Sequence, residues 1–203
     1  IHINMLNVRT IEDFLVKYGT SVIRPMYSTA DEYQRVVSDY LSGTHFVFDY
    51  DRFSSFEEVV SMNWEPDMSD IEAMFRLPYS VAAEKNIPVF IILEEFQNIM
   101  NDKDYEDVLK VMEKVLAEKA KSVSFVFTGS MVNAMKYIFA EKKKLITFFL
   151  MKSVSELLQR IVRIRSSIFL RLLQVHVPMC STVILMISLP RSSIGPIPPT
   201  LML

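Results

Sequence analysis

Two adjacent glutamates, Glu94 and Glu95, follow a run of bulky apolar residues in the segment IPVFIILEEFQNI, residues 87–99. A buried strand that ends on two acids places carboxylates at the carboxyl end of a sheet, where parallel α/β proteins bind their ligands. A nucleotide triphosphatase uses such a pair: the first carboxylate holds the Mg²⁺ shell and the second polarises the attacking water. The alternative is structural, because the same acids favour the start of a following helix.

A second predicted strand, SVSFVFTGS at 122–130, ends on the small polar residues Thr128, Gly129 and Ser130. If this strand lies beside the first, a hydroxyl at its exit is placed to contact a γ-phosphate or the attacking water. The N–H groups at the start of the next predicted helix, 131–144, also favour anions. The alternative is that Gly129 and Ser130 serve only as the turn and cap of that helix.

The elements that must position these residues alternate between apolar strands and amphipathic helices. Further strands are expected over 1–8 and 87–93, and further helices over 10–19, 29–43, 69–86 and 102–121. Nearly continuous apolar strands between amphipathic helices indicate a parallel sheet covered on both faces. We therefore predict an α/β fold with a three-layer α/β/α core. Residues 44–70 are aromatic and acidic, and we interpret them as an insertion with short elements of its own.

Capping residues set the expected helix boundaries. Thr10 is the predicted N-cap of the first helix, and Gly19 is its predicted end. The helix over 69–86 is expected to start at Ser69, with Glu72 three residues on as a capping box. Pro78 is expected to interrupt this helix, because proline lacks the N–H that an interior position donates.

Composition narrows the class of protein. The 203 residues are 50% hydrophobic with a net charge of −2, which suits a globular chain and does not support nucleic-acid binding. No apolar run reaches the roughly 18 residues that span a bilayer, so we expect no membrane segment and a cytoplasmic location. A single cysteine, Cys180, rules out an internal disulfide. The histidines, His2, His45 and His176, lack ligand-like spacing and are interpreted as structural.

The character of the chain changes after about residue 145. The net charge is −7 before this point and +5 after it, and five of the nine prolines lie in the last 58 residues. We therefore divide the chain into a core, 1–145, and a basic, proline-rich tail, 146–203. The tail either carries a basic amphipathic helix over 154–174 or is a poorly ordered, non-native read-through, since it lacks the local consistency of evolved sequences.

The pair PVFIILEEFQNIM and VSFVFTGSMVNAMKYIFAEKKK resembles an ATPase family found mainly in archaea and Bacteroidales-type bacteria, within the AAA-related P-loop NTPases. The resemblance covers roughly 1–145 and includes INMLNVRTIEDF, which is similar to the strand and helix after the P-loop helix. It implies a P-loop NTPase-like core that binds ATP and Mg²⁺. In this core Glu95 is the catalytic residue and Glu94 the Mg²⁺ ligand, with Thr128, Gly129 and Ser130 at the nucleotide.

The chain departs from this family at two places. Glu94 stands where the family has an aspartate, and its extra methylene shifts the carboxylate that would hold Mg²⁺. No GxxxxGK[ST] phosphate-binding loop is present, so we expect this chain alone to be inactive. The start at Ile1 suggests that the loop and its strand lie upstream. The edge of the 122–130 strand would then be unpaired unless TVILMIS, 182–188, fills the gap, and we favour the upstream strand.

Two functions remain open at this stage. The first is a fragment of an ATP hydrolase that carries the Walker B and sensor strands without the P-loop. The second is a non-catalytic protein-interaction module with a degenerate nucleotide site, in which 44–70 or the basic segment contacts a protein partner or a second copy of the chain.

Overall fold

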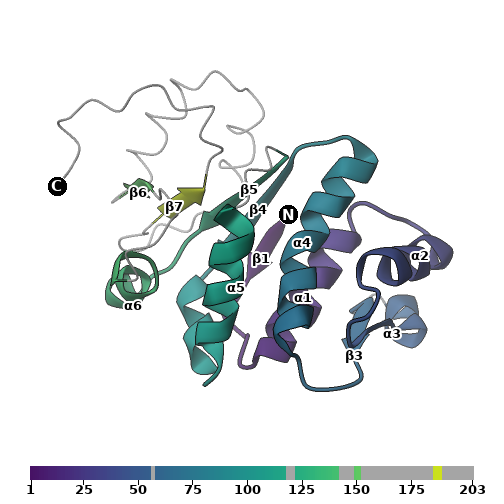
Figure 1. Ribbon diagram of the computed structural model, residues 1–203, viewed down its shortest axis with the longest axis horizontal. Helices are drawn as coiled ribbons and strands as arrows, with labels where there is room; N and C mark the ends of the chain where they lie inside the picture. Colours follow the sequence, from purple (N-terminus) through teal and green to yellow (C-terminus); the bar gives the residue numbers. More distant parts are fainter. Residues whose placement is uncertain (56–57, 118–121, 142–148, 152–184, 189–203) are drawn as a thin grey trace.

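The computed structural model describes residues 1–55, 58–117, 122–141, 149–151 and 185–188. A sheet runs through the centre of the molecule, with strand order β1-β4-β5-β7-β6 (Figure 1). Strands β1 (His2–Asn4), β4 (Val89–Glu94) and β5 (Val123–Phe127) are parallel to one another. Strands β7 (Leu185–Ser188) and β6 (Phe149–Met151) extend the sheet in antiparallel fashion. The predicted basic helix over 154–174 lies outside the described residues.

The free edge of β5 is covered by β7, with Phe127 opposite Met186 and Phe125 opposite Ser188. In this structure residues 185–188, at the end of the segment TVILMIS, supply the pairing strand, which was the less favoured of the two predicted solutions. The physical reason is that an apolar strand with unpaired N–H and C=O groups gains from any neighbour that can hydrogen-bond along it. A strand upstream of Ile1 lies outside the 203 residues and stays a prediction.

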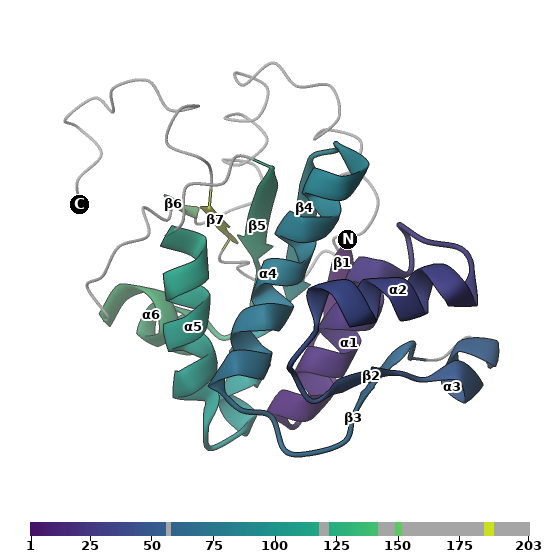
Figure 2. The same ribbon diagram turned by 45° about the vertical axis from the view of Figure 1, so that its right-hand side comes forward.

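Three helices pack on one face of the parallel strands: α1 (Ile11–Ile23), α4 (Met68–Lys85) and α5 (Tyr105–Ala117) (Figures 1 and 2). Helix α2 (Ala30–Tyr40) lies beside α4 at the outer end of this layer (Figure 2). Both crossovers, β1 to β4 and β4 to β5, step in the same direction, and right-handed connections then put their helices on the same face. The predicted α/β class is confirmed, and three of the strands are parallel, although the sheet as a whole is mixed.

Helices α1 and α4 differ from their predictions in their ends, in a cap and at a proline. Helix α1 starts at the predicted cap, Thr10, but continues through Gly19 to Ile23 because its buried face extends that far. Helix α4 is capped by Asp67 and not by Ser69: the Asp67 carboxylate accepts from the N–H groups of Ser69 and Asp70. It also continues through Pro78, where burial against the core outweighs the missing hydrogen bond.

Residues 44–70 form short elements of their own. Strands β2 (Phe46–Phe48) and β3 (Val60–Met62) make an antiparallel pair, and α3 (Tyr50–Ser54) lies between them. The pair packs on α1 and α2, with the aromatic rings of Tyr33 and Phe53 5.0 Å apart. This unit lies at the opposite end of the helical layer from β5 (Figure 2).

The core lies between the sheet and the helical layer. Alternate residues of β4, Val89, Ile91 and Leu93, are buried, while Phe90, Ile92 and Glu94 on the other face are half-buried. After β4 the chain forms a short 3₁₀ helix, η1 (Phe96–Asn101), and after β5 it forms α6 (Val132–Lys136) and a π-helical turn, η2 (Tyr137–Glu141). These two exits position the candidate site.

Candidate functional site

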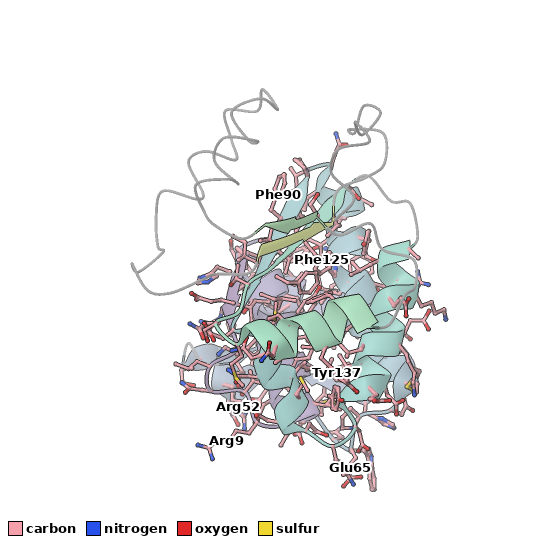
Figure 3. All side chains as sticks on the ribbon, turned by 90° about the vertical axis from the view of Figure 1, so that its left-hand side faces the viewer. Arg9, Arg52, Glu65, Phe90, Phe125 and Tyr137 are labelled. Carbon is pink, nitrogen blue, oxygen red and sulfur yellow. The ribbon has the colours of Figure 1, made fainter. Side chains whose placement is uncertain are left out.

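The exits of β4 and β5 lie side by side at the carboxyl edge of the sheet. The N–H of Thr128 donates to the Leu93 carbonyl and the N–H of Phe96 donates to the Thr128 carbonyl, both at 2.9 Å. These bonds continue the parallel ladder past the last paired residues of both strands. In Figure 3, Phe90 and Phe125 lie toward one end of the sheet and Tyr137, in the turn after α6, lies toward the other. The two predicted halves of the site are therefore adjacent.

Glu95 has a left-handed backbone conformation, with φ 56° and ψ 42°. A non-glycine residue pays about 1 kcal/mol or more for this conformation, so the surroundings must hold it. Its Oε2 atom accepts from the Ser130 hydroxyl at 2.6 Å and from the Gln97 side-chain amide at 2.5 Å. Glu95 makes no side-chain cap to η1. The alternative that it serves only to start a helix therefore does not describe its contacts.

The side chain of Gln97 packs closely against Gly129 and also contacts Glu95. The side chain of Gln97 is buried, and its Nε2 also lies 3.4 Å from the Ser130 Oγ. Its Oε1 faces Gly129 so closely that a Cβ at that position would lie 2.2 Å from it. Gly129 is thus needed for space, and not for an unusual φ. A larger residue here would force the side chains of Gln97 and Met135 to move.

Glu94 is held by β1, on the half-buried face of the sheet. Its Oε2 accepts from Asn4 Nδ2 at 2.9 Å and lies 3.0 Å from His2 Nε2. Asn4 is directly opposite Glu94 in the parallel register, and His2 lies two residues earlier on the same face. The β1 backbone is secured in turn by Lys17, whose Nζ donates to the Asn4 carbonyl at 2.5 Å. The Glu94 side chain remains 27% exposed.

The two carboxylates keep unused acceptor capacity. Within the described part of the chain, the hydrogen bonds of Glu94 and Glu95 all go to Oε2, and no lysine or arginine forms an ion pair with either residue. Oε1 of each residue therefore accepts no hydrogen bond from the described residues. Two sequence-adjacent carboxylates whose basic contact in the described residues is the histidine His2, and not a lysine or arginine, favour a bound cation.

The predicted nucleotide contacts differ in what they contribute. Ser130 is exposed and contacts Glu95 directly. Thr128 links the strand exits through its backbone, and Gly129 provides space for Gln97. Helix α6 has only five residues and begins two residues after Ser130, without a side-chain cap. The expected anion site at its start is not supported, because so short a helix has a small dipole.

A second carboxylate cluster lies at the start of α4. His45, Asp67 and Asp70 offer ligand atoms that all lie within 4.8 Å of one another. Asp70 is buried, and both of its oxygens are already used: Oδ1 accepts from the His45 N–H, and Oδ2 from the Asp67 N–H with His45 Nδ1 at 2.9 Å. A metal ion would have to displace these donors. We assign this cluster to helix capping.

His2, Asn4 and Gln97 belong to the site but were not predicted. His2 was interpreted only as structural, and it does hold Glu94 in place. A signal existed for Asn4, since polar residues two apart on a strand share a face, but the partner strand was unknown. For Gln97 the spacing of two residues from Glu95 carries no such signal.

Comparison of the chain with protein-family models, with curated proteins and with solved structures finds no match. Across the described residues, no helix has the length and the apolar character needed to cross a membrane. The function must therefore be argued from the geometry of the site.

Proposed function

We propose that this chain carries the Mg²⁺ and γ-phosphate side of an ATP-hydrolysing site. In this proposal Glu94 binds the Mg²⁺ shell and Glu95 polarises the attacking water, while Ser130, with Thr128 beside it, contacts the γ-phosphate. The supporting observation is the pair of free carboxylate oxygens at the exit of β4, next to the hydroxyl at the exit of the neighbouring parallel strand.

The charge and position of this pair favour phosphate chemistry with a cation. A phosphate group and two carboxylates repel one another, so Mg²⁺ must lie between them, and oxygen ligands suit Mg²⁺. The carboxyl edge of a parallel sheet is where such ligands bind in α/β proteins. The resemblance of the two strand exits to AAA-related P-loop NTPases points the same way, and the proposal includes their three-layer core and a cytoplasmic location.

The proposal requires a partner for the phosphates that the 203 residues do not contain. The four glycines, Gly19, Gly43, Gly129 and Gly195, do not form a GxxxxGK[ST] loop. Without such a loop, no row of backbone N–H groups cradles the β-phosphate and no lysine bridges it to the γ-phosphate. We therefore propose that this chain does not hydrolyse ATP alone, and that residues outside it supply the loop.

Glu94 also differs from the aspartate expected at a Mg²⁺ site. Its longer side chain reaches across to β1, where Asn4 and His2 hold Oε2. This contact leaves Oε1 as the atom available to a cation or to its bound water. We expect weaker metal binding than with an aspartate that points straight into the site.

A cation titration tests the proposal on the chain itself. Mn²⁺, followed by its electron paramagnetic resonance signal, substitutes for Mg²⁺. We expect Glu94→Ala to weaken Mn²⁺ binding about tenfold, as loss of one carboxylate ligand from a hard-cation site should. Asp107→Ala is the matched control, because Asp107 is an exposed acid paired with Lys110. Equal Mn²⁺ affinity in the wild type and in Glu94→Ala would remove the metal site from the proposal.

The nucleotide half needs a second measurement. Calorimetry of the 203-residue chain with Mg-ATP should show no binding, because the phosphate cradle is absent. In a longer chain that includes a phosphate-binding loop, Glu95→Gln should abolish turnover and retain ATP binding. Loss of ATP binding with residual turnover would contradict the role of Glu95. Tight Mg-ATP binding by the 203 residues would show that the loop is not required.

A non-catalytic interaction module is the second candidate, and one observation favours it. Leu6 and Met131, in the segments that follow β1 and β5, are 65% and 59% exposed. Large apolar side chains on the loops of a ligand-binding edge suit contact with a protein. If Mn²⁺ binding is independent of Glu94, this function becomes the better one, and Leu6→Ser with Met131→Ser should then abolish self-association or partner binding.

A further inference from the structure

The two donors on the Glu95 carboxylate differ in their environment. Gln97 is 5% exposed, whereas Ser130 is an exposed residue. Both donate to the same oxygen, Oε2, at 2.5 and 2.6 Å. A hydroxyl at the surface can exchange its acceptor for water or for a ligand at little cost. A buried amide that loses its acceptor keeps an unsatisfied donor, at a cost of about 1–3 kcal/mol.

The orientation of the Gln97 amide is set by Glu95. Within the described residues Oε1 of Gln97 has no hydrogen-bond partner, although it is buried. Rotating the amide by half a turn would place its carbonyl oxygen against the Glu95 carboxylate. Neither the Gln97 oxygen nor the Glu95 carboxylate would then have a donor from this contact. Gln97 Oε1 is therefore left without a hydrogen-bond partner, while Nε2 keeps its bond to Glu95.

The backbone around this contact allows little movement. Glu95 is held in the left-handed region, and both Gln97 Oε1 and the side chain of Met135 occupy the space where a Cβ of residue 129 would lie. The bond from the Phe96 N–H to the Thr128 carbonyl fixes the two turns relative to each other. Gln97 is thus confined by its packing, while the exposed Ser130 hydroxyl has a short bond to Glu95 and a longer contact, 3.4 Å, with Gln97 Nε2.

We propose that Gln97 is the positioning residue for the Glu95 carboxylate, a fixed donor that stays in place, while Ser130 is an exchangeable donor that a ligand at the carboxyl edge replaces. On ligand entry the Ser130 hydroxyl leaves Oε2 and donates to the ligand oxygen, and Gln97 keeps the carboxylate directed toward the same point. This inference deepens the proposed function, on which its ligand step rests. The contact itself is a property of the ligand-free chain.

Nuclear magnetic resonance of the Gln97 side-chain amide tests the fixed contact directly. We expect one of its two protons to resonate downfield of ordinary glutamine amides and to exchange with solvent about tenfold more slowly than those of Gln34. Gln34 is the internal control, because it is an exposed residue of α2. Assignment uses Gln97→Met, which keeps the length of the side chain and lacks the amide. A Gln97 amide that resembles that of Gln34 would overturn the proposal.

Variants of the two partners separate the fixed donor from the exchangeable one. Glu95→Ala should collapse the downfield resonance, whereas Ser130→Ala should leave it in place. In the unfolding equilibrium, Gln97→Met should raise the unfolding constant about fivefold and Ser130→Ala less than about twofold. If Ser130→Ala raises the unfolding constant more than Gln97→Met does, the assignments of the fixed and the exchangeable donor would be reversed.

Gly129→Ala provides a steric test. Its Cβ would lie 2.2 Å from Gln97 Oε1, so the amide must move and its resonance must shift. Gly19→Ala is the matched control, because its Cβ would meet the flexible end of Met74 at 2.9 Å, away from the site. An unchanged resonance in Gly129→Ala would contradict the close packing of Gln97 against Gly129. None of these readouts depends on nucleotide, so they can fail while the ATPase proposal stands, and the reverse also holds.

Discussion

The carboxylates at the start of α4 and those at the end of β4 are held in opposite ways. Asp70 is buried, and two backbone N–H groups and the His45 ring use both of its oxygens. Glu94 and Glu95 are partly exposed, and side-chain donors occupy one oxygen of each. A buried carboxylate whose two oxygens are both taken by the Asp67 N–H and by His45 serves the fold. One that keeps a free oxygen at a strand exit is available for chemistry.

The backbone shows the same contrast. Asp67 and Asp70 form a capping box in ordinary extended and helical conformations, so the cap itself needs no strained backbone. Glu95 is in a strained left-handed conformation that its neighbours from another strand maintain. Strain of this kind is typical of functional positions, because it persists only where tertiary contacts hold it.

The largest expected effect is in the first cluster. Asp70→Asn replaces one acceptor oxygen by an NH₂ group that faces N–H donors in a buried site. We expect a loss of about 2–3 kcal/mol in the free energy of unfolding. Urea denaturation measures it, with Asp107→Asn as an exposed control that should change by less than about 0.5 kcal/mol. If Asp70→Asn lowers the free energy of unfolding by less than Glu95→Gln does, the contrast between the two clusters would fail.

A third carboxylate, that of Glu84, adds to this comparison. Side chains hold it, and it lies far from the strand exits. Tyr27, Tyr40 and Arg35 donate to Glu84 at 2.5, 2.8 and 2.7 Å. These hydrogen bonds, that of Tyr27 first, lower the pKa of Glu84 from 4.5 to about 2.

Because this pKa is lower in the folded state, the stabilisation is fully present above about pH 4.5 and is lost as the pH falls toward about 2. Glu84→Gln should cost on the order of 1 kcal/mol at neutral pH once solvent screening is included. The difference between wild type and variant should shrink as the pH approaches 2. A difference that stays constant with pH would show that Glu84 is not charged in its cluster.

Glu95→Gln is the matched amide substitution at the proposed site. Glutamine keeps one acceptor oxygen for Ser130 or Gln97, so we expect a change below about 1 kcal/mol in the free energy of unfolding. The same urea experiment that measures Asp70→Asn measures it. A cost as large as that of Asp70→Asn would mean that Glu95 is structural, and the division between the two clusters would fail.

The smallest effect concerns a buried polar atom with no role at either cluster. Among the described residues the Tyr18 hydroxyl has no hydrogen-bond partner, and burial raises the pKa of Tyr18, so it stays neutral. Tyr18→Phe should be neutral or should stabilise the protein by up to about 1 kcal/mol.

Tyr33→Phe is the control for this change, because the Tyr33 hydroxyl donates to the Tyr27 carbonyl at 2.8 Å. It should destabilise the protein by about 1 kcal/mol. If Tyr18→Phe lowers the melting temperature more than Tyr33→Phe does, then a buried polar atom without a hydrogen-bond partner is not evidence that a neighbouring contact is preserved. The interpretation of Gln97 Oε1 would then lose its support.

Local pattern was sufficient to predict most of the fold near the site. The strand before Glu94, the helix capped by Thr10 and the strand before Thr128 follow from apolar spacing and from capping residues within a few positions. The cap of α4 was misplaced by two residues, because aspartate and serine are both good N-caps and the sequence does not rank them. The strand that pairs with β5 comes from a segment about 60 residues away, which no local signal specifies.

By itself the sequence determined the alternation of strands and helices and the presence of acids and hydroxyls at two strand exits, because side-chain period and turn chemistry are local properties. Only the tertiary structure decided which groups hold these residues. Asn4 meets Glu94 through the register of β1 on β4, while Ser130 meets Glu95 and Gly129 meets Gln97 through the packing of two turns. Such contacts depend on distances between segments some 30 to 90 residues apart, which are set by the folding of the whole sheet.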